Sequence, residues 1–162
     1  MEKQMNSLYR KIAEKVNEMI PVEWDTFYFN GEVENGEGGV YFFYNTPEEK
    51  EKYIYCYDIM ELYNGDTEIY EDLEDELFDL TNQLKQVFID NNQEPWFSIT
   101  IILSSQGRLK VDFDYAKWEN SEFGPTDIMK FWQKKYLKIE PKNENDRNKI
   151  KKIEQFIEES NN

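Results

Sequence analysis

The sequence contains no histidine and only one cysteine. Without histidine, acid–base catalysis by imidazole is excluded, and so are zinc sites built from the usual Cys and His ligands. The single cysteine, Cys56, has no partner for an internal disulfide and no histidine to activate its thiol. It alternates with aromatic residues over 53–57, which predicts a third, short strand and a core cysteine.

Long apolar runs and phosphate-binding motifs are also missing. The first twenty residues are charged and periodic, so we expect neither a signal peptide nor a membrane span and predict a cytoplasmic protein. The glycine-rich stretch 35–39 has no following helix and no lysine, and Glu32, Glu34 and Glu37 lie in or beside it. It is therefore interpreted as a turn, not as a phosphate site.

Aromatic residues and acids are plentiful. Eleven Phe, eleven Tyr and four Trp in 162 residues are enough to fill one hydrophobic core, so a single domain is expected. The formal net charge is −15, and residues 21–80 contain 18 acids but only 2 bases, a local net of −16. Such a segregated charge disfavours nucleic acid and anionic membranes as ligands and favours a basic protein surface.

Hydrophobic periodicity predicts four helices. Apolar residues recur at spacings of three and four over residues 2–20 and 67–90, and further helices are expected after Pro125 and over 143–159. Asp66 or Thr67 is the expected cap of the second helix. Its predicted apolar stripe comprises Ile69, Leu73, Leu77, Leu80, Leu84 and Val87.

Alternating segments predict the strands. Aromatic-rich stretches within 22–46 form a hairpin or meander, and residues 97–103 and 108–115 form a second hairpin with Leu109, Val111, Phe113 and Tyr115 facing inward. Arg108, Lys110, Asp112 and Asp114 would face water. The predicted fold class is α+β, in the order α-β-β-β-α-β-β-α-α. We expect one antiparallel sheet of about five strands with helices packed on one face.

Asp112 and Asp114 are the most plausible catalytic or metal-binding pair. Two residues apart on one strand, their side chains point to the same face, where they can hold Mg²⁺ or exchange protons. Lys110 shares that face, however, and polar residues are expected on any solvated sheet face. The acids of residues 72–79 have the spacing of a solvated helix face and do not match a calcium loop.

The order of several motifs resembles the YezG-like family of immunity proteins, which includes the EsaG-type antitoxins. The resemblance runs from about residue 5 to 157. It rests on Phe-Asn-Gly-Glu-Val at 29–33, Tyr-Asp-Ile at 57–59 and Asn-Gln-Glu-Pro-Trp at 92–96. It also rests on Ser-Ser-Gln-Gly at 104–107, Lys-Val-Asp-Phe-Asp-Tyr at 110–115, and the final segment with Trp132, residues 135–137 and Arg147.

The resemblance implies one immunity domain over residues 1–162, whose helix at 143–162 we expect to pack loosely. It implies a cytoplasmic, non-catalytic antitoxin without a cofactor that binds the nuclease domain of a toxin exported by a type VII secretion system. Charge and exposure alone predict the toxin-binding residues: Glu32, Glu34, Glu37, Tyr41, Asp66, Glu68, Tyr70, Glu71, Asp72, Asp75, Glu76, Asp79, Asp112 and Asp114. Tyr53 and Tyr55 are further candidate aromatic anchors.

Two alternatives stay open at this point. The same acidic surface suits a DNA mimic or adaptor that sequesters another basic protein, and Asp112 with Asp114 suits a metal-dependent enzyme. The oligomeric state is not predicted.

Overall fold

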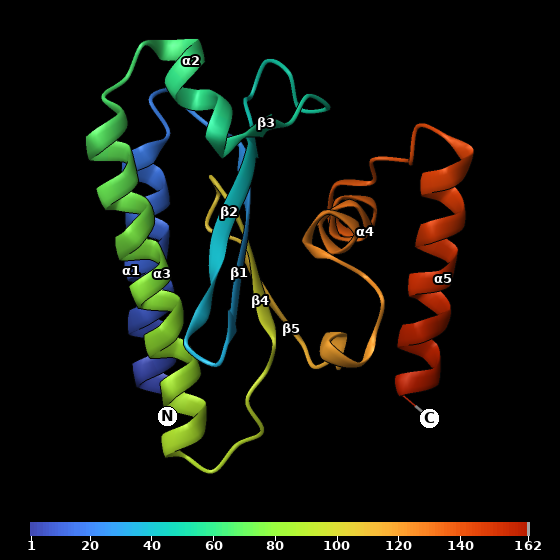
Figure 1. Ribbon diagram of the computed structural model, residues 1–162. Coiled ribbons are helices and arrows are strands. Elements are labelled where there is room, and N and C mark those ends of the chain that lie inside the picture. Colours follow the sequence, from blue (N-terminus) through green and yellow to red (C-terminus); the bar gives the residue numbers. More distant parts are fainter. Residues whose placement is uncertain (162) are drawn as a thin grey trace. The chain divides into compact units, whose positions relative to one another are not determined.

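The structure, a computed structural model, describes residues 1–161 in two compact units, Met1–Tyr115 and Ala116–Asn162 (Figure 1). The first unit contains α1 (Glu2–Met19), β1 (Thr26–Glu34), β2 (Glu37–Asn45), β3 (Ile54–Tyr55), the 3-10 helix η1 (Cys56–Asp58), α2 (Ile59–Tyr63), α3 (Thr67–Asp90), β4 (Ser98–Ser104) and β5 (Leu109–Asp114). The second contains the 3-10 helix η2 (Trp118–Asn120), α4 (Pro125–Leu137) and α5 (Glu144–Ser160). A single domain over 1–162 stays a prediction.

The first unit is built on one antiparallel sheet with the strand order β3-β2-β1-β4-β5. The predicted α+β class and five-stranded sheet are thus confirmed.

β1 and β2 are joined through Asn35 and Gly36 alone, both with positive φ, as a tight two-residue hairpin requires. The predicted turn 35–39 was too long, because Gly38 and Gly39 pair within β2. Only glycine fits at position 38 of β2, because a Cβ there would lie 1.9 Å from the Glu32 carbonyl oxygen.

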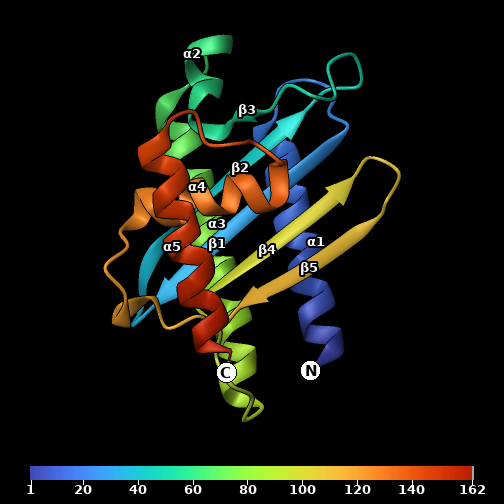
Figure 2. The same ribbon diagram turned by 90° about the vertical axis from the view of Figure 1, so that its right-hand side faces the viewer.

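Two helices, α1 and α3, cover one face of this sheet, as Figure 2 shows from a second direction. The predicted boundaries of both helices agree with the structure to within one residue. Their apolar stripes meet the inward side chains of the strands, because period 3.6 in a helix and period 2 in a strand each place apolar residues on one side. The fully buried centre includes Ile12, Val16, Phe27, Phe29, Leu77, Leu84, Ile99 and Ile101.

Further sequence predictions for this unit were wrong, and the short helix α2 was not predicted. The third strand comprises only Ile54 and Tyr55, and Cys56 begins η1, although its thiol is buried as expected. Ile69 is exposed, and Tyr70 takes the inward position at the start of α3. Leu109 and Tyr115, both predicted to face inward, are also exposed, because Leu109 begins the edge strand β5 beside the hairpin turn and Tyr115 follows its last residue.

The other face of the sheet is not the uniformly solvated surface that alternation predicted. Asn30 and Thr100 on this face expose only 1% and 4% of their surfaces. They pair in register across β1 and β4, where the Thr100 hydroxyl donates to Asn30 Oδ1 at 3.2 Å. Their burial is tolerable because each side chain has a hydrogen-bond partner.

In the second unit, α4 and α5 are joined by side-chain contacts. Lys130 with Asp146, Lys134 with Glu154, and Lys149 with Asp127 form ion pairs at 3.0 to 3.4 Å. The Trp118 ring lies 5.6 Å from the ring of Phe156. Asn143 caps α5 by accepting from the Asp146 amide, and Pro125 begins α4 as predicted. Loose packing of the last helix stays a prediction.

Candidate functional site

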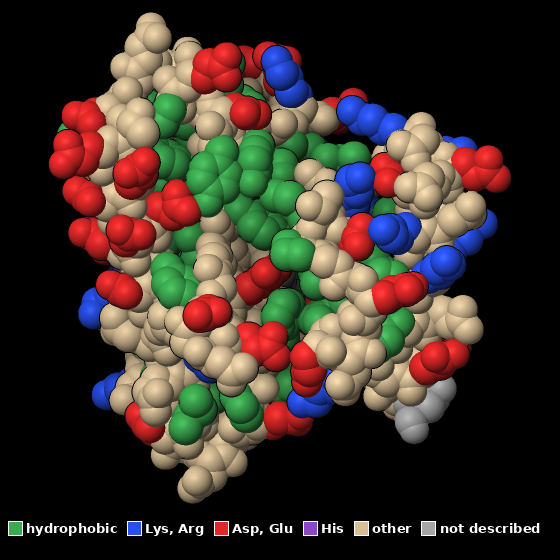
Figure 3. Space-filling model, in the orientation of Figure 1, with side chains coloured by type: hydrophobic (Ala, Val, Ile, Leu, Met, Phe, Trp, Pro, Cys, Tyr) green, Lys and Arg blue, Asp and Glu red, His purple; other side chains and the backbone are tan. Residues whose placement is uncertain are grey.

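Six carboxylates form one stripe along the first half of α3. They recur at spacings of three and four, which places them on one side of an α-helix. All six are exposed, and Figure 3 shows acidic side chains gathered along the outer side of α3. We call this stripe the acidic helix face; its residues are Glu68, Glu71, Asp72, Asp75, Glu76 and Asp79.

The opposite side of α3 fixes this face in place. Leu77, Thr81 and Leu84 are completely buried there, so the helix cannot rotate without exposing the core. Asp66 caps the helix, its carboxylate accepting from the amides of Glu68 at 3.0 Å and Ile69 at 3.3 Å. Asp66 is therefore a structural cap as well as a surface charge.

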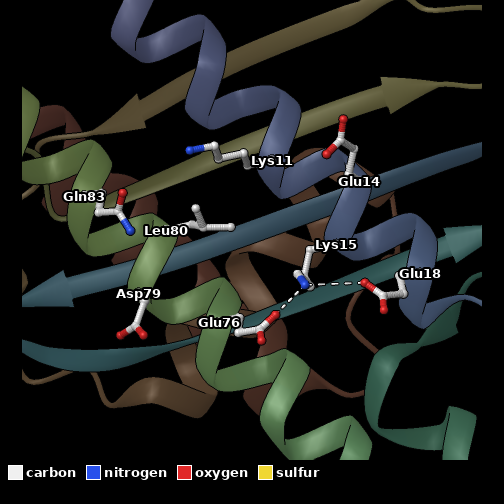
Figure 4. A pocket seen from close by; sticks show the side chains of 8 residues that line it. All are labelled: Lys11, Glu14, Lys15, Glu18, Glu76, Asp79, Leu80 and Gln83. Carbon is white, nitrogen blue, oxygen red and sulfur yellow. Dashed lines mark hydrogen bonds and ion pairs between the residues drawn. The ribbon is translucent and has the colours of Figure 1, made fainter.

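Little within the described residues neutralises the acidic helix face. Its one ion pair within residues 1–161 joins Glu76 to Lys15 of α1. The hydrogen bond to Glu76, and to a smaller extent the one to Glu18, raises the pKa of the Lys15 ammonium, although its burial acts in the opposite direction. Figure 4 shows Lys15 between these two carboxylates, in a groove of about 410 Å³ between α1 and α3. Leu80 and Gln83 also line this groove, which is open and of mixed charge.

The acidic helix face does not stabilise the helix that displays it. Glu68–Asp72, Glu71–Asp75, Asp72–Glu76 and Asp75–Asp79 are like-charge pairs at positions i and i+4. Such a pair destabilises a helix by roughly 0.2–0.5 kcal/mol. Only the acids of the first turn gain from the helix dipole. An accumulation of negative charge beyond that turn therefore calls for an explanation other than stability.

The three glutamates of the first hairpin lie apart from the acidic helix face. Glu32, Glu34 and Glu37 are at the turn end of β1 and β2, beside the second half of α3, where Lys85 donates to the Val33 carbonyl. Burial raises the pKa of the Glu32 carboxyl to about 7; the Asn30 amide opposes this rise, and the charge of Asp114 adds to it. Glu32 is thus only partly charged at neutral pH.

The raised pKa of Glu32 predicts a pH dependence of stability. The folded protein holds this proton more tightly than the unfolded chain, so its contribution is complete below the ordinary glutamate pKa and is lost as the pH rises through about 7. Glu32→Gln is expected to raise the free energy of unfolding at pH 8 by roughly 1–2 kcal/mol, with little effect at pH 4.5. Urea unfolding at both pH values measures this; equal changes at the two would contradict it.

The remaining predicted site residues lie in three different places. Tyr70 belongs to the core, its hydroxyl donating to the Cys56 carbonyl at 2.6 Å, so it offers no surface for a partner. Tyr41 is half-buried in β2. Asp112 and Asp114 are half-buried in β5, opposite Thr100 and Ser98, with Lys110 3.8 Å from Asp112.

No cluster suited to a metal is found among residues 1–161, in the sense of three or more adjacent Asp, Glu or Cys side chains. Over the same range, no helix has the length and hydropathy that crossing a bilayer requires.

Cys56 does not offer a reactive thiol. Burial raises its pKa to about 12, and its sulfur accepts from the Phe42 amide at 3.4 Å. Since the thiolate is the reacting species, we expect iodoacetamide to alkylate the native protein at least about 100-fold more slowly than the urea-unfolded chain. Mass spectrometry over time provides the measurement, and comparable rates in the two states would show an accessible cysteine.

Sequence reasoning missed a group of exposed apolar residues around the beginning of α3. Tyr57, Leu62, Tyr63 and Ile69 all lie at the surface. The available signal was the run 58–68, in which apolar residues are interrupted by Asp58, Glu61, Asn64, Gly65 and Asp66. This pattern is too polar for a core element.

Comparison with known proteins identifies the family. The model of the family "Immunity protein YezG-like" matches residues 5–151. The type VII secretion system protein EsaG of Staphylococcus aureus is 35% identical over 158 residues, which cover 98% of this chain and 96% of EsaG. The immunity protein YezG of Bacillus spizizenii is 34% identical over 138 residues, 85% of each chain. That of Bacillus subtilis is 34% identical over 143 residues, 88% of this chain and 94% of the relative. This chain therefore belongs to the YezG-like immunity protein family.

Proposed function

We propose that this protein binds the nuclease domain of a secreted toxin through its acidic helix face and thereby neutralises it. The proposal makes the protein a cytoplasmic antitoxin with no catalytic activity of its own. Membership of an immunity protein family supports the general role, and the name of the EsaG relative supports a toxin exported by a type VII secretion system.

The observation that carries the nuclease assignment is the acidic helix face itself. A nuclease must hold a polyanion, so the cleft that receives DNA or RNA is lined with Lys and Arg. Five of the six carboxylates on the acidic helix face make no ion pair within residues 1–161, and so remain available to such groups. Their mutual repulsion would be relieved by cations of the partner.

The charge of the whole first unit reinforces this attraction. Residues 1–115 contain 25 acids and 9 bases, a net of −16, whereas residues 116–162 contain 9 acids and 10 bases, a net of +1. Long-range attraction of this kind raises association rates, which matters for an inhibitor whose free target is lethal. We therefore expect the first unit to be the part of the protein that binds the positively charged partner.

The test is a DNA-cleavage assay with the nuclease domain of a cognate toxin. We expect an equimolar amount of this protein to suppress cleavage and an equal amount of bovine serum albumin, another acidic protein, to leave it unchanged. Full cleavage in the presence of excess protein would contradict the proposal. Recovery of a DNA-binding regulator instead of a nuclease in a pull-down from the source cell would favour the adaptor alternative.

A further inference from the structure

The segment from Tyr57 to Ile69 exposes a concentration of apolar side chains. Tyr57, Leu62, Tyr63 and Ile69 expose 45%, 58%, 40% and 58% of their surfaces. They are half of the eight large hydrophobic residues exposed in the described part of the chain, although the segment spans only thirteen positions. Single exposed apolar residues are ordinary, but a group of them marks an interaction site. We call these four residues the apolar patch.

Local structure directs these side chains outward. Within the five-residue helix α2, Ile59 is buried and fixes the helix to the core, which leaves Leu62 and Tyr63 at the surface. Asn64 then takes a left-handed conformation with φ of 49° and ends α2, so that α3 can begin after its cap at Asp66. Ile69 lies in the first turn of α3.

The apolar patch adjoins α3, the helix that bears the acidic helix face. The Tyr57 hydroxyl donates to the carboxylate of Glu74 on α3 at 2.5 Å, so this ring lies against the helix that bears the acids. Ile69 follows Glu68, the first residue of the acidic helix face, directly in sequence. Figure 1 shows α2 next to the beginning of α3.

The charge around the apolar patch restricts what can cover it. Asp58, Glu61, Asp66 and Glu68 are all exposed, and residues 57–69 contain no Lys or Arg. A second copy of this chain would bring four negative charges against four more, and an anionic membrane would be repelled in the same way. A protein with an apolar pocket rimmed by basic side chains fits both the apolar area and the charge.

We propose that the apolar patch is the hydrophobic anchor of the toxin complex, seated in an apolar pocket next to the basic cleft of the nuclease domain. This inference rests on the proposed function. It assigns two separate tasks: the acidic helix face accelerates association, and the apolar patch slows dissociation, because desolvated apolar anchors at an interface act mainly on the lifetime of a complex.

A matched pair of double variants tests this division. Leu62→Ser with Ile69→Ser removes two members of the apolar patch. Ile89→Ser with Leu109→Ser removes one Leu and one Ile of similar exposure, 47% and 48%, elsewhere in the first unit. Each is measured by surface plasmon resonance against the toxin's nuclease domain carrying an inactivating substitution. We expect the Leu62/Ile69 variant to have a dissociation rate about 10- to 100-fold higher than that of the original protein and an association rate within threefold of it. The Ile89/Leu109 variant is expected to keep both rates unchanged.

The outcomes separate the two proposals. Tight binding by the original protein with unchanged dissociation of the Leu62/Ile69 variant would overturn the anchor and leave the proposed function standing. No binding by the original protein would overturn both. Sedimentation that shows a dimer of the original protein, abolished in the Leu62/Ile69 variant, would identify a second copy as the occupant. The single variant Leu62→Ser, which removes only an exposed side chain, must change dissociation in the same direction.

Discussion

Replacing Glu71, Asp72 and Asp75 with their amides is expected to slow association with the nuclease domain by roughly 10- to 100-fold. These three carboxylates lie at the centre of the acidic helix face, are exposed, and form no ion pair within the described residues. Amides keep the size and polarity of the side chains, so the lost quantity is charge. Stopped-flow or surface plasmon resonance measurements at 50 mM salt, where screening is weakest, give the rate.

The control variant replaces Glu119, Glu122 and Glu158 with Gln. It changes the net charge by the same three units but alters exposed positions of the second unit. Because local charge and not the total governs the encounter, its association rate is expected to stay within twofold of the original. Equal slowing in both variants would show that net charge alone matters and that the acidic helix face has no special part.

Leu77→Ala is expected to lower the free energy of unfolding by about 3 kcal/mol. Leu77 is completely buried in the middle of α3, near Val40 and Phe42 of β2. Truncation removes its apolar contacts and leaves a cavity between helix and sheet that the surrounding side chains fill only in part. Urea denaturation monitored by circular dichroism at pH 7 measures the change.

The matched control for this substitution is Ile69→Ala on the same helix. Ile69 has the same predicted place in the apolar stripe but exposes 58% of its surface, so its truncation is expected to change stability by less than about 0.5 kcal/mol. A similar loss for both variants would show that the Ile69 side chain packs against the core.

The contrast between Leu77 and Ile69 also shows why sequence predicted the helix better than its contacts. Apolar periodicity and the Asp66 cap determine where α3 lies, and both are local properties. Which residues of its first turn face inward depends on how the preceding η1 and α2 pack beside it. Tyr70 takes the inward position, where its hydroxyl donates to the Cys56 carbonyl. Such tertiary pairing is not visible in the spacing of residues.

The candidate site was predictable in part for the same reason. Six of the seven acids over residues 68–79 recur at spacings of three and four and so share one side of α3, which means that the acidic helix face follows from the sequence. Glu32, Glu34 and Glu37 are equally acidic and close in sequence, but the hairpin places them by the other half of α3. The apolar patch was not predicted, because exposure of Leu62 and Tyr63 depends on the short α2 packing on the core through Ile59 and Met60 at its start.

The carboxylates of the acidic helix face are expected to lower the stability of the protein and to strengthen its binding to the toxin, and both effects can be measured. Neutralising Asp75 and Asp79, which repel each other at positions i and i+4, is expected to raise the free energy of unfolding by roughly 0.2–0.5 kcal/mol. The same change should weaken the toxin complex. Opposite signs for folding and binding are typical of residues that serve a partner.

Carboxyl footprinting of the toxin complex tests the central claim most directly. Carbodiimide and glycine ethyl ester label exposed Asp and Glu side chains, and mass spectrometry gives the extent at each position with and without the nuclease domain. We expect labelling of Glu71, Asp72 and Asp75 to fall at least about fivefold in the complex, because a partner then covers their carboxylates, while Glu119, Glu122 and Glu158 react as before. Unchanged labelling of Glu71, Asp72 and Asp75 in a formed complex would show that the toxin binds elsewhere.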